Sequence, residues 1–427
     1  MRVYYSLYGR LLDKALLLAS YKKVRRAQGA AGIDGQTLGS FGASLEGNLA
    51  QLLLELQTKQ YRPHPVRRVE IPKEDGGVRL LGIPTVRDRV VQQALNDLMM
   101  PIFEEQFHPS SFGYRPARSC HDAINKATMF IRRYHMKYVV DMDLSKCFDK
   151  LNHELILSSI RKRISDSSIL ELIKQFLESG VMVDGEWQAS DLGSPQGGVI
   201  SPLIANIYLD AFDQQMRRQG QRIVRYADDI LIFSRSRKGA ENALKQATKI
   251  LEQDLKLTVN EQKTHIAHSC MGVKFLGVEI GSQFTRIQAK KVTAFKEKLK
   301  ALTRRNNGMS MKDIVRALNP VLRGFSQYFR IANAKKAFGQ IAHWLRRRLR
   351  AVQLAQWKKP MRLHRRLKQL GYKPPFKFIK MASWRNAGSP LVHYAIPNHW
   401  FEEVGLVDIG TVETGYVFSR YAEWKLT

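Results

Sequence analysis

The spacing of hydrophobic and polar residues divides the chain into a mixed first part and a helical second part. Residues 1–62 have helical spacing, which is broken by a glycine-rich stretch at 29–42. Residues 63–84 read as two strands around the turn Asp75-Gly76-Gly77, a typical β-hairpin signal. Helical and strand patterns then alternate through residues 85–282. The pattern predicts an α+β fold in this part of the chain.

From about residue 286 onward, apolar residues recur at helical spacing only. A long helix is predicted from about Lys335 to Trp357. Prolines at 360, 374 and 375 set off a smaller last region. We therefore expect an all-α region, whose inward-facing residues are Val292, Phe295, Leu299, Leu302, Ile314, Leu318, Val321, Phe325, Phe338, Ile341, Leu345 and Leu349.

Two adjacent carboxylates, Asp228 and Asp229, lie at the tip of a second predicted hairpin, between apolar runs at 223–224 and 230–233. Their like charges repel, and burying either one is costly unless a cation compensates it. A divalent metal ion could compensate both, because hard cations prefer carboxylate oxygens and a tight turn can direct adjacent side chains to one point. A solvated Asp-Asp turn is the alternative, so a third carboxylate is needed to decide.

A third carboxylate, Asp143, follows a β-branched run. Alternate residues of a strand point to one face, so Asp143 is expected on the same side as Asp141, with Met142 in the core. Two metal ions about 4 Å apart can activate an attacking hydroxyl and hold the leaving phosphates. Asp143 and the Asp228-Asp229 pair would supply the carboxylates for such a site. For Asp141 and Asp149, a helix-cap or surface role is favoured.

The order of motifs along the chain resembles that of group II intron reverse transcriptases, also called maturases. The palm motifs of that family resemble Val140–Asp149, Gly193–Gly198 and Arg225–Asp229. Earlier matches are Gly32–Gly35, Ile71–Arg79 and Phe112–Pro116; later, Val273–Val278 resembles the primer-grip hairpin and Leu322–Phe329 the maturase thumb. The resemblance extends from about residue 25 to 360. It implies a right-hand polymerase with fingers and palm, followed by an all-α thumb and a small basic C-terminal region.

The resemblance divides the chain into four predicted parts. They are an N-terminal extension with the start of the fingers (1–62), a fingers and palm reverse transcriptase domain (63–285), a helical thumb (286–372) and a C-terminal DNA-binding region (373–427). Many relatives end in a nuclease domain with paired histidines and cysteine metal ligands. After about residue 390 this chain has only two histidines and no cysteine, so it resembles the bacterial type that lacks the endonuclease.

A nucleotide pocket is also implied by the resemblance. Lys73 and Arg79 on the first hairpin would close on the incoming triphosphate, Arg through a fork of donors and Lys through a compact charge. Gln196, beside two glycines that permit close approach, would hydrogen-bond the base or sugar. Phe148 would leave no room for a ribose 2′-hydroxyl and so select deoxynucleotides. Lys263 would lie near the triphosphate, with a solvated lysine as the alternative.

The predicted metal site and primer contact include further residues. The resemblance implies that Leu144 joins Asp143, Asp228 and Asp229 in holding the metal. The expected cofactor is Mg²⁺, as two ions, with Mn²⁺ as a substitute. The primer grip is expected at Phe275, Leu276 and Gly277.

The formal net charge of +31 predicts a polyanionic partner, because so much charge otherwise destabilises a compact chain. The three scattered cysteines favour a reducing compartment and form no zinc pattern. We see neither a signal peptide nor a run of about twenty apolar residues, so no membrane is expected as a partner. Together with the resemblance, which implies a bacterial protein, these features predict a cytoplasmic protein associated with nucleic acid.

Positive charge is concentrated in the helical part of the chain. Residues 314–401 contain nineteen Lys and Arg and no Asp or Glu, whereas a solvated helix face normally mixes both signs. Aromatic residues interleave with these cations, which suits backbone tracking with base or sugar stacking. Nucleic-acid contacts are therefore expected from Arg346, Arg347, Arg348, Arg350, Lys358 and Lys359.

These observations predict an RNA-directed DNA polymerase, in which a primer 3′-hydroxyl attacks the α-phosphate of a dNTP. Its partners would be an RNA template, a DNA or RNA primer, dNTPs and a group II intron RNA, with the protein as a monomer or homodimer. One alternative is an RNA-binding splicing cofactor that uses the polymerase fold as a platform. Others are a stand-alone reverse transcriptase in DNA repair and an RNA-templated RNA polymerase, which Phe148 argues against.

Overall fold

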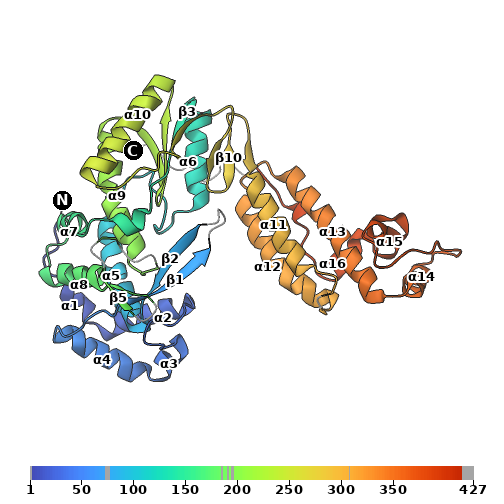
Figure 1. Cartoon of the computed structure of the whole chain (residues 1–427), viewed down its shortest axis with the longest axis horizontal. Helices are drawn as coiled ribbons and strands as arrows, with labels where there is room; N and C mark the ends of the chain where they lie inside the picture. The colour runs from blue at the N-terminus through green and yellow to red at the C-terminus, as the bar shows by residue number, and fades with distance from the viewer. Residues whose placement is uncertain are drawn as a thin grey trace. The chain divides into compact units, whose positions relative to one another are not determined.

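The computed structural model describes residues 2–72, 77–183, 186–189, 192–193, 197–306 and 308–415. The chain forms two compact units, Met1–His268 and Ser269–Thr427, and each is described by itself (Figure 1). The boundary between the units falls before the predicted primer-grip hairpin. The four-part division expected from the sequence stays a prediction.

Four helices begin the first unit, where helical spacing predicts them: α1 (Tyr8–Leu11), α2 (Lys14–Arg26), α3 (Leu38–Ala43) and α4 (Leu45–Gln57). Polar side chains determine where two of them begin. Asp13 accepts a hydrogen bond from the Ala15 amide at the start of α2. Thr37 and Ser40 form a capping box at the start of α3. The predicted break in helical structure falls between α2 and α3.

The first predicted hairpin is confirmed. β1 (Val66–Pro72) pairs antiparallel with β2 (Val78–Ile83), in a register that places Pro72 opposite Val78. β4 (Val181–Val183) and β5 (Glu186–Gln188) extend this sheet in the order β2-β1-β4-β5. The tip of the hairpin, with Lys73, lies outside the described residues.

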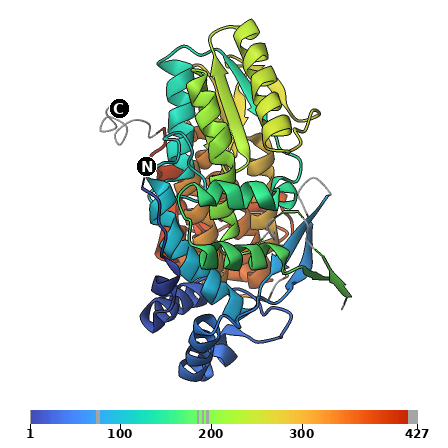
Figure 2. The same ribbon diagram turned by 90° about the vertical axis from the view of Figure 1, so that its left-hand side faces the viewer.

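The second sheet contains the acidic hairpin. Its strands pair antiparallel in the order β6 (Arg222–Tyr226), β7 (Asp229–Ser234), β3 (Tyr138–Met142) and β8 (His265–His268). Side chains alternate along β7: Ile230 and Ile232 join the main hydrophobic core, whereas Phe233 packs on Phe130 of α6 (Cys120–Arg132). The opposite face packs on α10 (Arg237–Lys249), and Figures 1 and 2 show the strands between these two helices.

Four further helices complete the core of this unit: α5 (Val86–Glu104), α7 (His153–Arg161), α8 (Ser167–Glu178) and α9 (Ser201–Arg218). Helix α7 begins after Asn152 because that side chain accepts a hydrogen bond from the Leu155 amide.

The second unit begins with a small sheet in the order β11 (Thr285–Ile287), β10 (Val278–Ile280), β9 (Val273–Phe275). Helices α11 (Ala289–Leu302), α12 (Met311–Phe329), α13 (Lys335–Trp357) and α14 (Pro360–Gln369) follow, with the shorter α15 (Pro390–Ala395) and α16 (Asn398–Glu403) after them. The bounds of α13 are those predicted from its apolar spacing.

The predicted apolar stripes of these helices do face inward. Leu299 of α11, Leu318 of α12 and Phe338 of α13 are all fully buried. Among the helices of the described residues, none is long and apolar enough to cross a membrane.

Candidate active site

The hairpin of β6 and β7 closes through a two-residue loop, Ala227-Asp228, because Tyr226 pairs directly with Asp229. Ala227 has a φ of 57°, in the left-handed region. Positive φ in such a loop suits the twist of the flanking strands, although it costs an alanine about 1 kcal/mol. The turn thus presents Asp228 and Asp229 in succession at one end of the sheet.

Asp143 directly follows β3, the neighbouring strand. Since β3 is antiparallel to β7 with Met142 opposite Ile230, continuing this register by one residue brings Asp143 opposite Asp229. Met142 is 1% exposed and Asp143 is half-buried, which agrees with the predicted alternation. Two separate segments therefore bring three carboxylates to the same end of the sheet.

These carboxylates raise one another's affinity for protons. The side chain of Asp229 contacts solvent, yet the protein around it displaces much of its water. This desolvation, followed by the charges of Asp228, Asp141 and Asp143, raises the pKa of Asp229 to about 7. Desolvation also raises the pKa of Asp228, and the charge of Asp143 adds to it. Carboxylates that resist ionisation together are typical of sites that a divalent cation stabilises.

A loop before β8 contacts Asp143 through three of its residues. Asn260 donates from Nδ2 to Oδ2 of Asp143 at 3.1 Å, and Nζ of Lys263 lies 3.9 Å from the same oxygen. The amide of Asp143 donates to Oγ1 of Thr264 at 3.3 Å. Lys263 is therefore beside a candidate metal ligand. Sequence reasoning missed Asn260, whose only signal was its place three residues before Lys263.

The donor chemistry of the three aspartates fits a divalent metal ion, because hard cations take carboxylate oxygens. In the described part of the chain, no group of three or more His, Cys, Asp or Glu side chains converges as a ready-made metal cage. The fit thus rests on the donor types and on the raised pKa values of Asp228 and Asp229.

The remaining residues predicted for the pocket lie as follows. Phe148, in a short 3-10 helix at Cys147–Lys150, is 8% exposed and joins the hydrophobic core. Leu144 is also buried, and it forms an isolated bridge with Val259. Arg79 is exposed on β2, and its charge opposes the rise in the pKa of Asp228. Gln196, like Lys73, lies outside the described residues.

In the second unit, the predicted primer grip forms the tight turn between β9 and β10. Leu276 and Gly277 have φ of 45° and 80°. The hydroxyl of Tyr328 donates to the Leu276 carbonyl at 2.8 Å, which fixes the turn on α12. Phe275 is 4% exposed and so contributes to packing.

The expectation that Arg350 contacts nucleic acid is contradicted. Arg350 is 1% exposed, donating from Nε to the Ile396 carbonyl and from Nη2 to Oδ1 of Asn398, both at 2.9 Å. A guanidinium with these internal partners is a structural group. A linear run of cations does not show which of them face inward.

The neighbouring cations of α13 are partly engaged. Arg346 forms an ion pair with Asp408 at 2.9 Å, and this partner lies beyond the acid-free stretch. Arg347 lies over the ring of Trp384, and Arg348 donates from Nε to Oγ1 of Thr303. Of the cations predicted to contact nucleic acid, Lys358 and Lys359 are exposed.

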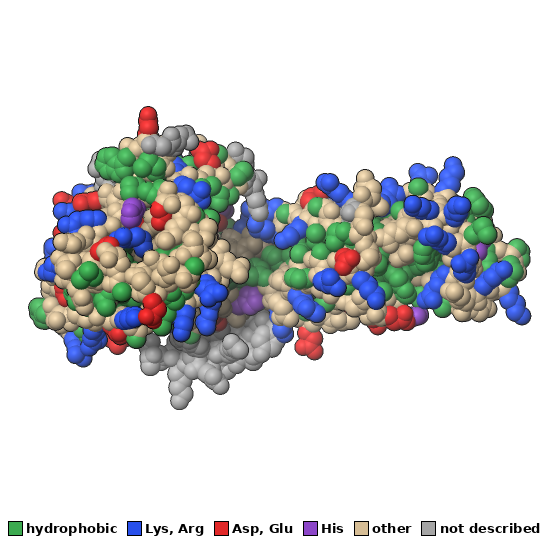
Figure 3. Space-filling view, turned by 90° about the horizontal axis from the view of Figure 1, so that it is seen from below, with side chains coloured by type: hydrophobic (Ala, Val, Ile, Leu, Met, Phe, Trp, Pro, Cys, Tyr) green, Lys and Arg blue, Asp and Glu red, His purple; other side chains and the backbone are tan. Residues whose placement is uncertain are grey.

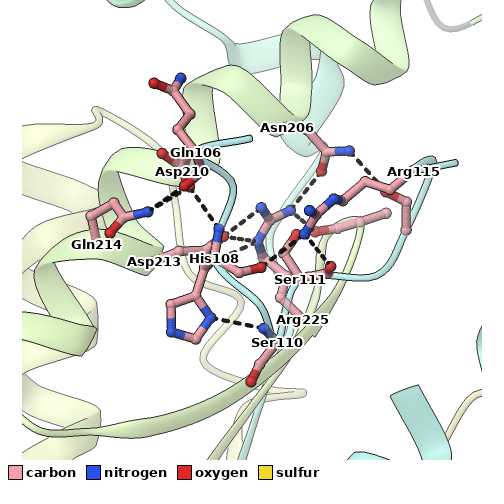
Figure 4. Close-up of polar contacts among 12 residues, drawn as sticks. Gln106, His108, Ser110, Ser111, Arg115, Asn206, Asp210, Asp213, Gln214 and Arg225 are labelled. Carbon is pink, nitrogen blue, oxygen red and sulfur yellow. Dashed lines mark hydrogen bonds and ion pairs between the residues drawn. The ribbon is translucent and has the colours of Figure 1, made fainter. Parts of the chain in front are cut away.

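A buried polar network beside the acidic turn was also missed by sequence reasoning (Figure 4). It joins Arg225 of β6 to Asn206 and Asp213 of α9, and Arg115 to the segment around His108. The available signal was an arginine inside an apolar strand, together with acidic residues on the buried face of a helix.

Three carboxylates at the end of a sheet, together with a basic hairpin, are typical of enzymes that transfer nucleotidyl groups with the help of metal. The family follows from two matches. Residues 71–280 match the model for reverse transcriptase (RNA-dependent DNA polymerase), and residues 292–371 match the group II intron, maturase-specific domain. The chain belongs to the group II intron reverse transcriptases and is an RNA-directed DNA polymerase. Membership implies a divalent metal and nucleic-acid partners, including intron RNA.

Individual relatives agree with this family. Protein YkfC of Escherichia coli (strain K12) is 34% identical over 308 residues, which cover 63% of this chain and 81% of YkfC. Group II intron-encoded protein LtrA of Lactococcus lactis subsp. cremoris is 28% identical, and the match covers 65% of this chain and 57% of LtrA. A structure of apo telomerase from Candida tropicalis aligns at a TM-score of 0.41 and 15% identity over 56% of this chain and 60% of that one, too low to support an argument. The predicted family, fold class and enzyme class are confirmed.

Proposed function

We propose that the three aspartates are the catalytic residues of this polymerase. Asp143, Asp228 and Asp229, with the Leu144 carbonyl, would hold two Mg²⁺ ions, for which Mn²⁺ can substitute. The single observation that supports this assignment is that the strand register brings Asp143, Asp228 and Asp229 to one end of the sheet, where desolvation and mutual repulsion raise the pKa of Asp228 and Asp229. Such ions, when bound, lower the pKa of an attacking hydroxyl and neutralise charge on the phosphates.

The chain's own residues bind and orient the other reactants. Arg79 lies close enough to influence Asp228 electrostatically, a position that suits binding of the dNTP triphosphate together with Lys73. Lys263 brings a third cation beside Asp143. Phe148 offers a buried, rigid ring that excludes a 2′-hydroxyl, and Gln196 contacts the base or sugar.

The second unit would bind the template, the primer and intron RNA. The observation that favours a splicing role is the maturase-specific match over residues 292–371. Lys and Arg side chains are spread over the visible face of this unit, the right-hand part of Figure 3. Exposed cations such as Lys358, Lys359 and Arg362 suit phosphate contacts. The monomer or homodimer state and a cytoplasmic location remain predictions.

Primer extension on an RNA template with dNTPs tests the catalytic assignment. Asp228→Asn, which keeps the shape of the side chain, should lower incorporation by at least about 100-fold, because it removes one metal-binding charge. The matched control is Asp254→Asn, on an exposed aspartate whose carboxylate contacts Gln215, and it should retain activity. Near wild-type incorporation by Asp228→Asn would refute the assignment.

A further inference from the structure

Arg225 is a fully buried charge next to the acidic turn. Its side chain and that of Asp213 are both 0% exposed. Nε of Arg225 lies 2.9 Å from each carboxylate oxygen of Asp213, and Nη2 lies 2.6 Å from Oδ2. Burying such a pair removes two charges from water, and apolar residues of similar volume are often as stable or more stable. The stability of the fold therefore does not explain why this pair is present.

The remaining nitrogen of Arg225 points to the catalytic turn. Nη1 donates to Oδ1 of Asn206 at 2.9 Å and to the carbonyl of Ala227 at 3.0 Å. Ala227 is the left-handed residue directly before Asp228. The side chain of Arg225 thus reaches two residues forward along its own chain and holds the peptide group from which Asp228 follows.

The segment packed against this turn is itself fixed. The amide of Phe112 donates to the Arg225 carbonyl at 2.8 Å, and the amide of Arg225 donates to the Ser110 carbonyl at 2.9 Å. Gly113 lies so close to the turn that a Cβ there would be 2.4 Å from the Ala227 nitrogen. Asn206, which accepts from Arg225, also donates to the Gly113 carbonyl at 2.8 Å. One amide side chain therefore connects the arginine to this close contact.

Arg115 fixes the start of the same segment. Its Nη1 donates to the carbonyls of His108 and Ser111 at 2.8 and 2.7 Å, and its Nη2 forms an ion pair with Glu104 at 2.7 Å. The turn consequently rests on a segment with its own buried support. Asp228 and Asp229 repel each other at the tip of the hairpin, and this repulsion favours a more open loop. Packing against a rigid segment opposes that opening.

We propose that Arg225, oriented by Asp213 and Asn206, is a positioning residue that fixes the Ala227–Asp228 peptide and thereby directs the Asp228 carboxylate to the metal site. This inference rests on the proposed catalytic role of Asp228. Arg225 contacts neither substrate nor metal, and it acts only through the backbone of the turn.

Arg225→Lys tests the inference, since lysine keeps the buried cation but its single nitrogen cannot take the separate positions from which Nε, Nη1 and Nη2 reach Asp213, Asn206 and Ala227. In single-nucleotide extension, kcat should fall by about 10- to 100-fold and the Mg²⁺ concentration for half-maximal rate should rise, as for other groups that orient metal ligands. KM for the dNTP and affinity for template–primer should stay unchanged, because neither contacts Arg225. The isosteric Asp213→Asn should shift the same quantities in the same direction and serves where the lysine variant does not fold.

Arg163→Lys is the matched control, because Arg163 is a buried arginine of the same unit that donates to the Arg2 carbonyl and to Gln106. It should lose comparable stability without a change in kcat or in the Mg²⁺ midpoint. Equal losses of kcat in both lysine variants, or an unchanged Mg²⁺ midpoint in Arg225→Lys and Asp213→Asn, would overturn the inference. An active Asp228→Asn enzyme would instead refute the catalytic assignment, so the two failures are distinguishable.

Discussion

Asn260 donates a hydrogen bond from Nδ2 to Oδ2 of Asp143 at 3.1 Å, and the backbone amide of Asn260 donates to the Asp143 carbonyl at 2.8 Å. Asp143 is thus held through both its backbone and its side chain by a residue far along the chain. The loop that contains Asn260 also brings Lys263 to the same carboxylate. The orientation of Asp143, a candidate metal ligand, is therefore set by a loop that follows the β6–β7 hairpin.

Asn260→Ala should lower the polymerase rate, because Asp143 would lose the donor that orients its carboxylate. We expect a fall in kcat of about 10-fold and a higher Mg²⁺ requirement, with template–primer affinity unchanged. Primer extension across a Mg²⁺ series measures both quantities. Asn319→Ala is the control, because the Asn319 side chain also donates from Nδ2, to the Gly405 carbonyl, but lies in the second unit. An unchanged Mg²⁺ requirement would contradict the orienting role.

Phe148→Val should relax the choice of sugar. Removing the ring opens space where the 2′-hydroxyl of a ribonucleotide would lie, so the ratio of kcat/KM for a dNTP to that for the matching NTP should fall by at least about 10-fold. The smaller side chain also leaves a cavity in the core, which should lower the free energy of unfolding by about 1–3 kcal/mol. Phe176→Val, in the same core, controls for the stability loss alone. Unaltered discrimination would exclude Phe148 as the sugar gate.

The buried pair His108 and Asp210 should give a hidden pH dependence of stability. Desolvation lowers the pKa of His108 to about 4, and desolvation together with the charge of Asp213 raises the pKa of Asp210 to about 6. Between pH 4 and pH 6 this pair of residues holds one proton in the folded protein, on Asp210. In the unfolded chain the pair also holds one proton, on His108. The two contributions therefore cancel, and this pair adds little to the pH dependence of stability in this window.

Asp210→Asn should expose the histidine contribution. The charge of His108 in the unfolded chain is then no longer offset, so stability relative to the wild-type protein should fall by roughly 1.4 kcal/mol per pH unit as the pH drops from about 6 toward 4. His108→Gln should show the opposite change, with stability relative to the wild-type protein rising as the pH falls from 6.5 toward 4, because the opposing contribution of His108 is removed. Urea denaturation at a series of pH values measures both slopes. Parallel curves for the two variants would refute the pairing.

Substitutions at Arg350 and Lys359 should have different effects, because Arg350 is a structural cation and Lys359 is an expected RNA-binding cation. Arg350→Met leaves the Ile396 carbonyl and Asn398 without a donor, so the free energy of unfolding should fall by about 2–3 kcal/mol. The affinity of the folded protein for RNA should not change. Lys359→Ala should leave stability intact, weaken RNA binding and reduce the slope of log K against log salt by about 1. A smaller salt slope for Arg350→Met would contradict its internal assignment.

Local pattern was sufficient for much of the fold. Helix α13 and the β1–β2 hairpin have the positions that apolar spacing and turn residues predict, because both depend on contacts near in sequence. Asp228 and Asp229 could be singled out because two carboxylates at a turn between apolar strands are unusual. The motif order then identified the family.

Long-range contacts limited the prediction. Nothing in a linear run of arginines shows that Arg350 faces the core while Lys359 faces solvent, since α13 packs on segments that follow it. Asn260 and Asp213 act through partners on other elements, and neither has a periodic signal. Roles that depend on which segments meet must be read from the folded chain.

The left-handed alanine before Asp228 has a consequence for how this sequence can vary. Glycine at position 227 would relieve about 1 kcal/mol of backbone strain, but it would also give the unfolded chain more conformations, an opposing effect of about 0.4–1 kcal/mol. The two effects nearly cancel, so global stability hardly distinguishes the two residues. What alanine adds is a narrower range of loop shapes in the folded enzyme. Replacing Ala227 with glycine should therefore change the rate of catalysis more than the thermal stability of the protein.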